Sequence, residues 1–374
     1  FLVYLTICKV SAFLVDRRKK GSEKQKLSLS LKEKNKDMLN IARPLLLLAI
    51  CCSFISNSVA QEENVKVSAD TLNAEWQSTI LAAIDSFPER GGYYTGGKPN
   101  ALFANTTWQG LHAAYQMGIN DRKPYFCPEK AQPSFCSSAT YSALIKALTM
   151  WDKQGVISTE AWRNMKPYVG IADDINTEGI GQDDGEGFWG RANANGPSIA
   201  VLIHELKAGY SFTAYRGAKT LRNKESESET YLTDDEWRAD PVWQHAMKGD
   251  FMKIFWNKNE SKGSDCGAII GCNDVKGDDQ EAGHSVIFMG YTPDGKVTYW
   301  SSNGPGEHPE LLGYSIGTCD KTDIQRVVFT RITHPERFNE VKNIAPKNVN
   351  QYLYDLNGKK HSNTAELKRQ CGIK

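Results

Sequence analysis

Three polar side chains in this sequence have the types and the order needed for catalysis by a thiol nucleophile. Cys136 lies in "PSFCSSATYSALIKAL" (133–148), where a helix is expected to begin. The backbone amides at a helix N-terminus carry partial positive charge and stabilise a thiolate. His284 near the start of "GHSVIFMGY" is a candidate base, and Asn303 at the end of "KVTYWSSN" is a candidate partner for it. Cys136 also admits a structural reading, as a buried cysteine or one bonded to Cys127.

A predicted hairpin brings the second and third of these residues together. The "PDG" triplet (293–295) between the two runs is a turn signal and predicts antiparallel pairing. In such a pair the start of one strand lies beside the end of the other, so His284 is expected opposite Asn303. The amide oxygen of Asn303 would then accept the imidazole N–H and fix the tautomer. The alternative is that Asn303, which precedes Gly304, only begins a turn.

The helices and strands that must position these residues are indicated by the spacing of apolar residues, which changes along the chain. Apolar residues at helical spacing and N-capping residues predict helices in the first half, and short β-branched or aromatic runs predict strands in the second. Helices are expected within 69–87, 104–117, 136–155, 158–169 and 198–212, and strands within 249–256, 284–292, 296–303 and 324–332. The sequence therefore predicts an α+β fold with N-terminal helices packed on an antiparallel sheet.

The first sixty residues have the pattern of a secretory leader. Residues 1–37 are expected to be upstream sequence or a segment without structure. Residues 38–60 have a basic start, an apolar run and small residues before Gln61, which predicts a signal peptide cleaved after Ala60. An uncleaved membrane anchor is the alternative. A secreted or periplasmic protein without a stable membrane anchor after cleavage is expected.

Removal of the leader changes the charge and the cysteine count. The formal net charge is +1 for the whole chain, but residues 1–60 are strongly basic, so the remainder carries about −6. An acidic protein lacks the electrostatic footprint of a nucleic-acid binder. Six cysteines remain after Ala60, and Cys266 with Cys272 is the favoured disulfide. The acidic residues at 173–186 lack the spacing of a calcium loop, so no metal and no cofactor are expected.

Taken in order, the motifs resemble the NlpC/P60 and CHAP branch of the papain-like cysteine peptidases. The similar features are a cysteine at a helix start, the strand "GDFMKIFW" (249–256), "GHSVIFMGY" and a polar residue on the next strand. His284 follows Cys136 by 148 residues, which suits papain-like enzymes. The resemblance covers about 103–338. It implies a papain-like fold and an exported hydrolase of peptidoglycan amide bonds, with catalytic roles at Cys136, His284 and Asn303.

Other residues are candidates for binding a substrate. Trp189, Arg191, Asn193 and Asn195 in "GEGFWGRANANGP" (185–197) could present stacking and hydrogen-bonding groups to a sugar or peptide, and Trp300 could line the same groove. A structural loop is the alternative for this motif. The backbone N–H of Cys136 is expected to bind the oxyanion, with Gln132, Gln109 and Tyr125 as candidates for a second donor.

The expected organisation follows from these assignments. The expected segments are 1–37 upstream, 38–60 signal peptide, 61–100 an N-terminal helix and Gly-rich loop, 101–338 a catalytic domain with an insertion at 173–245, and 339–374 a C-terminal extension. The expected function is a cysteine peptidase or amidase that cleaves peptidoglycan stem peptides through a thioester acyl-enzyme. A papain-fold acyltransferase and a non-catalytic cell-wall or glycan-binding protein are the alternatives.

Overall fold

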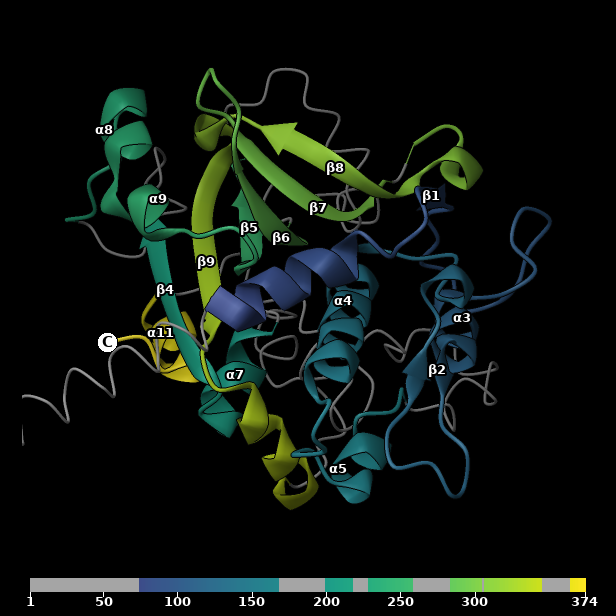
Figure 1. Ribbon diagram of the computed structural model, residues 1–374. Coiled ribbons are helices and arrows are strands. Elements are labelled where there is room, and N and C mark those ends of the chain that lie inside the picture. The colour runs from purple at the N-terminus through teal and green to yellow at the C-terminus, as the bar shows by residue number, and fades with distance from the viewer. Residues whose placement is uncertain (1–73, 168–198, 218–227, 258–282, 305, 345–363) are drawn as a thin grey trace, which may run out of the picture. The chain divides into compact units, whose positions relative to one another are not determined.

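The fold is described from a computed structural model, shown in Figure 1. It describes residues 74–167, 199–217, 228–257, 283–304, 306–344 and 364–374. The expected leader, the favoured disulfide and the "GEGFWGRANANGP" motif lie outside the described residues. Within the described ranges, none of the helices is long and apolar enough to cross a membrane.

A seven-stranded antiparallel sheet organises the chain, in the order β1-β8-β7-β6-β5-β9-β4 (Figure 1). Its strands are β1 Arg90–Gly91, β4 Gly209–Tyr215, β5 Phe251–Trp256, β6 Gly283–Tyr291, β7 Val297–Asn303, β8 Gly313–Cys319 and β9 Ile324–Ile332. Strands β2 Tyr115–Gln116 and β3 Tyr125–Phe126 form a separate pair. The four strands that the sequence predicts are β5, β6, β7 and β9, and the tight turn pairs β6 with β7 as expected.

Helices occur throughout the described residues. They are a helix over residues 74–84, α3 Thr107–Ala114, α4 Cys136–Trp151, α5 Thr159–Asn164, α7 Ala200–Leu206, α8 Asp234–Ala239, α9 Pro241–His245 and α11 Thr364–Cys371. Short 3-10 turns are η1 Pro128–Lys130, η5 Pro309–Leu311, η6 Lys321–Asp323 and η7 Pro335–Asn343. The mixed architecture confirms the predicted α+β class.

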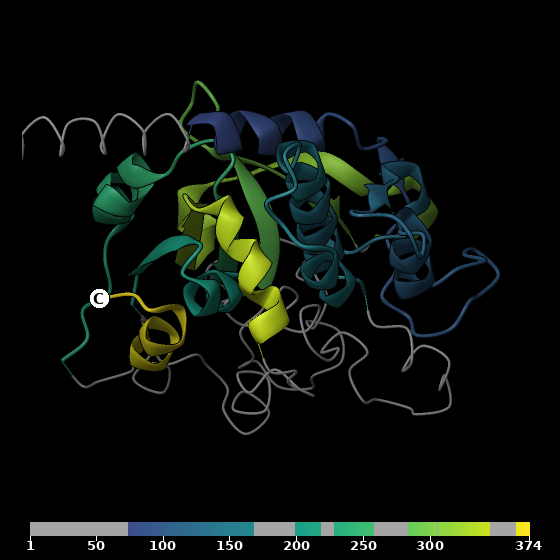
Figure 2. The same ribbon diagram turned by 60° about the horizontal axis from the view of Figure 1, so that its bottom comes forward.

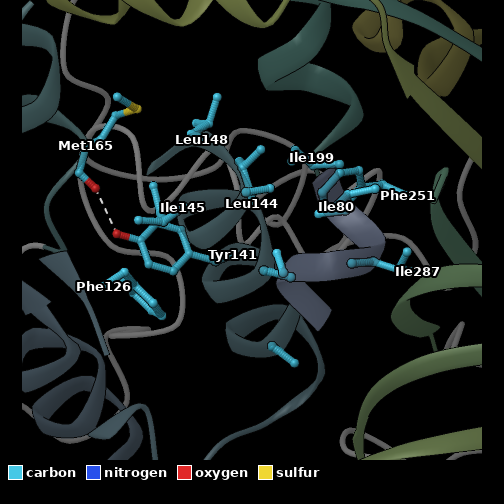
Figure 3. Packing of buried hydrophobic residues seen from close by; sticks show 14 of the residues in the cluster. Ile80, Phe126, Tyr141, Leu144, Ile145, Leu148, Met165, Ile199, Phe251 and Ile287 are labelled. Atoms are coloured by element: carbon cyan, nitrogen blue, oxygen red, sulfur yellow. Dashed lines mark hydrogen bonds between the residues drawn. The ribbon is translucent and has the colours of Figure 1, made fainter. Parts of the chain in front are cut away.

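Helix α4 is the central helix of the fold. Twelve of its sixteen residues are buried, as expected for a helix covered on several sides. It packs on β6 and β7, and Leu144 and Leu148 belong to the same apolar cluster as Ile287 of β6 (Figure 3). Tyr141 ties the helix to the end of α5 by donating its hydroxyl to Met165 O at 2.7 Å. The helix is therefore held against the sheet.

The two faces of the sheet are covered by different elements. Strand side chains alternate between faces, so Ile287 joins the α4 cluster while Val286 and Phe288 join a second cluster. That second cluster includes Trp237 of α8 and Trp243 of α9. Because both faces are buried, the register of the central strands is strongly fixed.

The predicted insertion at 173–245 is only partly correct, because part of it belongs to the sheet. Strand β4 lies at the sheet edge and pairs along its whole length with β9. The sequence analysis placed the first residues of β4, "GYSF", at the end of the preceding helix. The left-handed conformation of Lys207 (φ 54°) instead ends α7, and the alternating "GYSFTAY" continues as a strand.

The expected C-terminal extension is also part of the body. In α11, Leu367 is fully buried and clusters with Phe255 of β5 and Val328 of β9. The helix lies beside α7, as the yellow and teal helices of Figure 2 show. The polar composition of α11 did not indicate that it packs on the body, because only one narrow stripe of the helix is apolar.

An ion pair fixes the residue that immediately precedes β5. Two of the three guanidinium nitrogens of Arg331 on β9 donate to Asp250, with Nε–Oδ1 at 2.8 Å and Nη2–Oδ2 at 2.7 Å. Arg331 also donates to His245 O and to the hydroxyl of Tyr210. A buried bidentate pair of this kind constrains the two strands to one relative position.

Candidate active site

Cys136 is the first residue of α4, as the sequence predicts. Its neighbour Phe135 has extended backbone and precedes the helix. The start is fixed by Ser138, whose hydroxyl accepts the Phe135 N–H at 2.8 Å and donates to Phe135 O at 2.7 Å. These contacts fix the first turn of α4, in which Cys136 lies. Cys136 is 8% exposed, and Cys136 and Cys127 both carry free thiols, so the alternative disulfide between them is not formed.

His284 and Asn303 meet across the β6–β7 ladder. Nε2 of His284 lies 2.8 Å from Oδ1 of Asn303, which is the contact that the predicted hairpin implies. The two residues extend the register in which Ile287 faces Trp300. The register shifts by one residue between Phe288 and Gly290, so the tight turn and this irregularity together set the pairing that brings the two residues opposite each other.

Strand β8 sets the orientation of the Asn303 amide. Nδ2 of Asn303 donates to Ser315 O at 3.0 Å and to Ser315 Oγ at 2.9 Å. A backbone carbonyl can only accept, so the amide nitrogen must face Ser315 and the amide oxygen must face His284. The neutral imidazole consequently carries its proton on Nε2 and keeps the lone pair of Nδ1 for another partner.

That partner is the thiol of Cys136. Burial raises the pKa of this thiol, but a hydrogen bond from the His284 side chain and the charge of His284 lower it. The charge of Lys253 and a backbone hydrogen bond from Ser285 act in the same direction, and the pKa falls to about 6. The sulfur is therefore mainly thiolate at neutral pH, which is the reactive form of cysteine.

Aromatic rings enclose His284. Trp256 at the end of β5 lies nearly parallel to the imidazole at 6.4 Å between ring centroids, and Tyr299 meets it edge-on at 5.5 Å. His284 itself is 6% exposed. Limited access of water strengthens the hydrogen bond to Asn303, because competition from solvent and dielectric screening are both reduced.

The structure corrects the assignment of Trp300 to a binding groove. Trp300 is 5% exposed and stacks on Tyr314 at 5.5 Å, with Phe87 against its edge. It is three positions from Asn303 on one strand, so the two side chains point to opposite faces of the sheet. Trp300 is a core residue. Trp189, Arg191, Asn193 and Asn195 lie outside the described residues.

Two of the three candidates for a second oxyanion donor have other positions. Gln109 completes the capping box of α3, where its Oε1 accepts the Thr106 N–H at 2.8 Å. Tyr125 is 65% exposed on the small β2–β3 pair. Gln132, four residues before Cys136, remains a candidate for the second oxyanion donor. Its side chain lies over Gly91, where a Cβ on that glycine would come within 2.5 Å of Gln132 Cδ.

Sequence analysis missed two residues that complete the site, Lys253 and Ser315. Ser315 was missed because β8, with glycines near both ends, was not recognised as a strand. Lys253 had a signal: it is the one charged residue in the run "FMKIFW", where every other residue is apolar.

Among the described residues, His, Cys, Asp and Glu side chains form no cluster of three that could hold a metal ion. The chemistry available to the described site is that of a thiolate, an imidazole and an amide that orients it. Comparisons of the chain with protein-family models, with curated proteins and with solved structures find no significant match.

Proposed function

We propose that this protein is a cysteine hydrolase of amide bonds that acts through Cys136, His284 and Asn303. The observation that carries the proposal is the 2.8 Å contact between His284 Nε2 and Asn303 Oδ1, beside a thiol with a pKa of about 6. A thiol with only a structural role has no need of a base whose tautomer is fixed in this way.

The proposal includes a papain-like fold. Its support is the combination of a nucleophile at the N-terminus of a central helix with a base and an amide on adjacent antiparallel strands packed on that helix. The order of the motifs that resemble NlpC/P60 and CHAP peptidases agrees with this arrangement.

The reaction begins with attack of the Cys136 thiolate on the amide carbonyl carbon. A C–S bond forms, and the carbonyl electron pair moves to the oxygen, which accepts a hydrogen bond from the backbone N–H of Cys136. The imidazolium of His284 then gives its Nδ1 proton to the amide nitrogen as the C–N bond breaks. The amine leaves, and the acyl group remains on sulfur as a thioester.

Water completes the cycle. His284, now neutral, takes a proton from a water molecule as its oxygen attacks the thioester. The C–S bond breaks, the carboxylic acid leaves and gives its proton to the solvent, and the thiolate–imidazolium pair is restored. Asn303 holds the ring throughout, so that Nδ1 faces the sulfur in both half-reactions.

The proposed substrate is the stem peptide of peptidoglycan, and the proposed location is outside the cytoplasm. Both rest on the resemblance and on the expected export signal rather than on the described residues. The substrate is therefore a separate claim from the thiol chemistry, and the two need separate tests.

The thiol mechanism is tested with purified peptidoglycan. Wild-type protein is expected to release new amino groups, and Cys136→Ala to release none above background. Cys127→Ala is the matched control, because Cys127 is also a free thiol of the described chain and should be dispensable. Equal release by wild type and Cys136→Ala would exclude the mechanism. Transfer to an added amine in preference to hydrolysis would identify an acyltransferase.

A further inference from the structure

Lys253 is a buried cation in the middle of the sheet. It lies on β5, is 3% exposed, and pairs in register with Ser285 of β6 on one side and Val328 of β9 on the other. Lysine is rarely buried to this extent, because removal of an ammonium group from water is costly. A lysine at such a position calls for a reason beyond packing.

Its side chain lies on the α4 side of the sheet. Residues two apart on a strand share a face, so Lys253 is on the face of Phe251, and Ser285 is on the face of Ile287. Both Phe251 and Ile287 belong to the cluster that includes α4. The ammonium group and the helix that carries Cys136 are therefore on the same face.

The Lys253 side chain lies beside Gly283 and Ser285, the two residues that flank the candidate base. Nζ of Lys253 lies 3.4 Å from Ser285 Oγ. A Cβ on Gly283 would come within 2.8 Å of Lys253 Cε and 3.1 Å of Nζ, so the side chain occupies the space that this glycine leaves open. Gly283 and Ser285 are the neighbours of His284. The ammonium thus lies beside the segment that supplies both the His284 side chain and the Ser285 backbone group to the cysteine sulfur.

The charged groups around this region come from three strands. His284 on β6 contacts the sulfur, and Lys253 on β5 is the second cation that acts on it. Arg326 on β9 packs against the Phe255 ring at 5.9 Å, and Lys253 approaches the same ring at 5.8 Å. Arg326 donates to Thr364 Oγ1 at 2.9 Å and is not among the groups that act on the pKa of Cys136. Lys253 is thus the permanent cation associated with the thiol.

We propose that Lys253 is a positioning residue whose buried ammonium group holds the negative charge on Cys136 whether or not His284 is protonated. The role given to the charge rests on the proposed function, in which the thiolate is the nucleophile. An imidazolium attracts the thiolate only while it keeps its proton, and it gives that proton away during the reaction. An ammonium that is not consumed keeps the sulfur a good leaving group when the thioester is hydrolysed.

The test uses two alkylating reagents that differ in charge. Iodoacetate is an anion and iodoacetamide is neutral, so the ratio of their rates at Cys136, followed by mass spectrometry of that peptide, reports positive charge near the sulfur. Lys253→Met keeps the length of the stem and removes the charge, and it should lower this ratio severalfold. It should also raise the apparent pKa of Cys136 alkylation by about one unit or more. Lys253→Arg keeps the charge and should retain most of the ratio.

Two further measurements separate the charge from packing. In His284→Ala the preference for iodoacetate should persist, because Lys253 remains, and it should disappear in the double variant with Lys253→Met. If Lys253→Met does not fold, as judged by thermal unfolding, His284→Ala decides: without the imidazolium, Cys136 should still favour iodoacetate more than Cys127, which lies beside Glu129. A folded Lys253→Met with unchanged ratio and pH profile would overturn the proposal, as would equal ratios at the two cysteines.

The outcomes also separate this inference from the proposed function. If wild type releases no amines from any amide substrate but its alkylation ratio depends on Lys253, the hydrolase proposal fails and the charge effect stands. If amine release depends on Cys136 while the iodoacetate-to-iodoacetamide ratio is unchanged in Lys253→Met, only the role of Lys253 is excluded.

Discussion

Cys136 is distinguished from the other described cysteines by what surrounds its sulfur. Burial raises the pKa of Cys371 to about 12, and burial and the Glu129 carboxylate raise that of Cys127. Burial acts on Cys136 in the same direction, but the hydrogen bond and charge of His284, the charge of Lys253 and the Ser285 backbone together outweigh it, and the pKa is about 6. A specific cationic partner, rather than burial or exposure, therefore decides which thiol is reactive.

This difference predicts a pH dependence. The rate at which iodoacetamide alkylates Cys136 should rise through a midpoint near pH 6 and stay high at neutral pH. The sign follows from the lowered pKa: the thiolate is already formed above pH 6, and it is protonated as the pH falls below it. Cys127 should react only at higher pH, because its pKa is raised. A midpoint for Cys136 at or above that of Cys127 would contradict the assignment.

At the scale of elements, three adjacent strands form one hydrogen-bonded relay. Ser315 on β8 orients the Asn303 amide on β7, and Asn303 orients the imidazole of His284 on β6. Each contact crosses one strand boundary, so the register of the sheet sets the tautomer of the base. The relay needs no flexible loop, which favours a preorganised site.

Removal of the middle of this relay should slow turnover. Asn303→Ala removes one hydrogen bond to the ring, and a loss of about three- to tenfold in kcat is expected from the typical net value of such a bond. Cys136 should still be alkylated readily, because the thiolate keeps its contact with His284. Steady-state kinetics combined with alkylation rates distinguish the two effects.

Ser315→Ala is the matched control for this variant. It removes one of two acceptors for Asn303 Nδ2 and leaves the backbone carbonyl of residue 315 in place. Its effect on kcat should be clearly smaller than that of Asn303→Ala. If both variants kept wild-type kcat, the orienting role of the amide would be wrong.

At the scale of the described molecule, the C-terminal helix belongs to the body that holds the site. Leu367 of α11 packs with Phe255 and Val328, and Phe255 is also the ring against which Lys253 and Arg326 lie. A helix that follows a long polar stretch of sequence thus supports the strand that carries Lys253.

Leu367→Ala should therefore destabilise the fold. Truncation of a fully buried leucine typically lowers the free energy of unfolding by about 2–5 kcal/mol, through lost apolar contact and the cavity that remains. Urea unfolding measures the change. Arg369→Ala, at an exposed position of the same helix, is the matched control and should alter stability little. Similar stability of both variants would show that α11 does not contribute to the core.

Local signals in the sequence were enough for much of this architecture. Capping residues predicted the start of α3 at Asn105 or Thr106 and that of α5 at Ser158; in the structure the side chains of Thr106 and Ser158 accept a backbone N–H. Alternating apolar runs predicted the four central strands. These features depend on residues a few positions apart, so short windows of sequence contain them.

The sequence by itself determined the order of Cys136, His284 and Asn303 and the hairpin that pairs the last two, because a tight turn is a local structure. Only the tertiary structure decided which other side chains gather around them. It moved Trp300 into the core, since a residue three positions along a strand points the opposite way. It brought in Ser315 and Lys253 from strands β8 and β5, whose pairing depends on contacts distant in sequence. Long-range pairing of this kind leaves no periodic trace in one chain, and so the charge that surrounds a nucleophile is known only once the sheet is assembled.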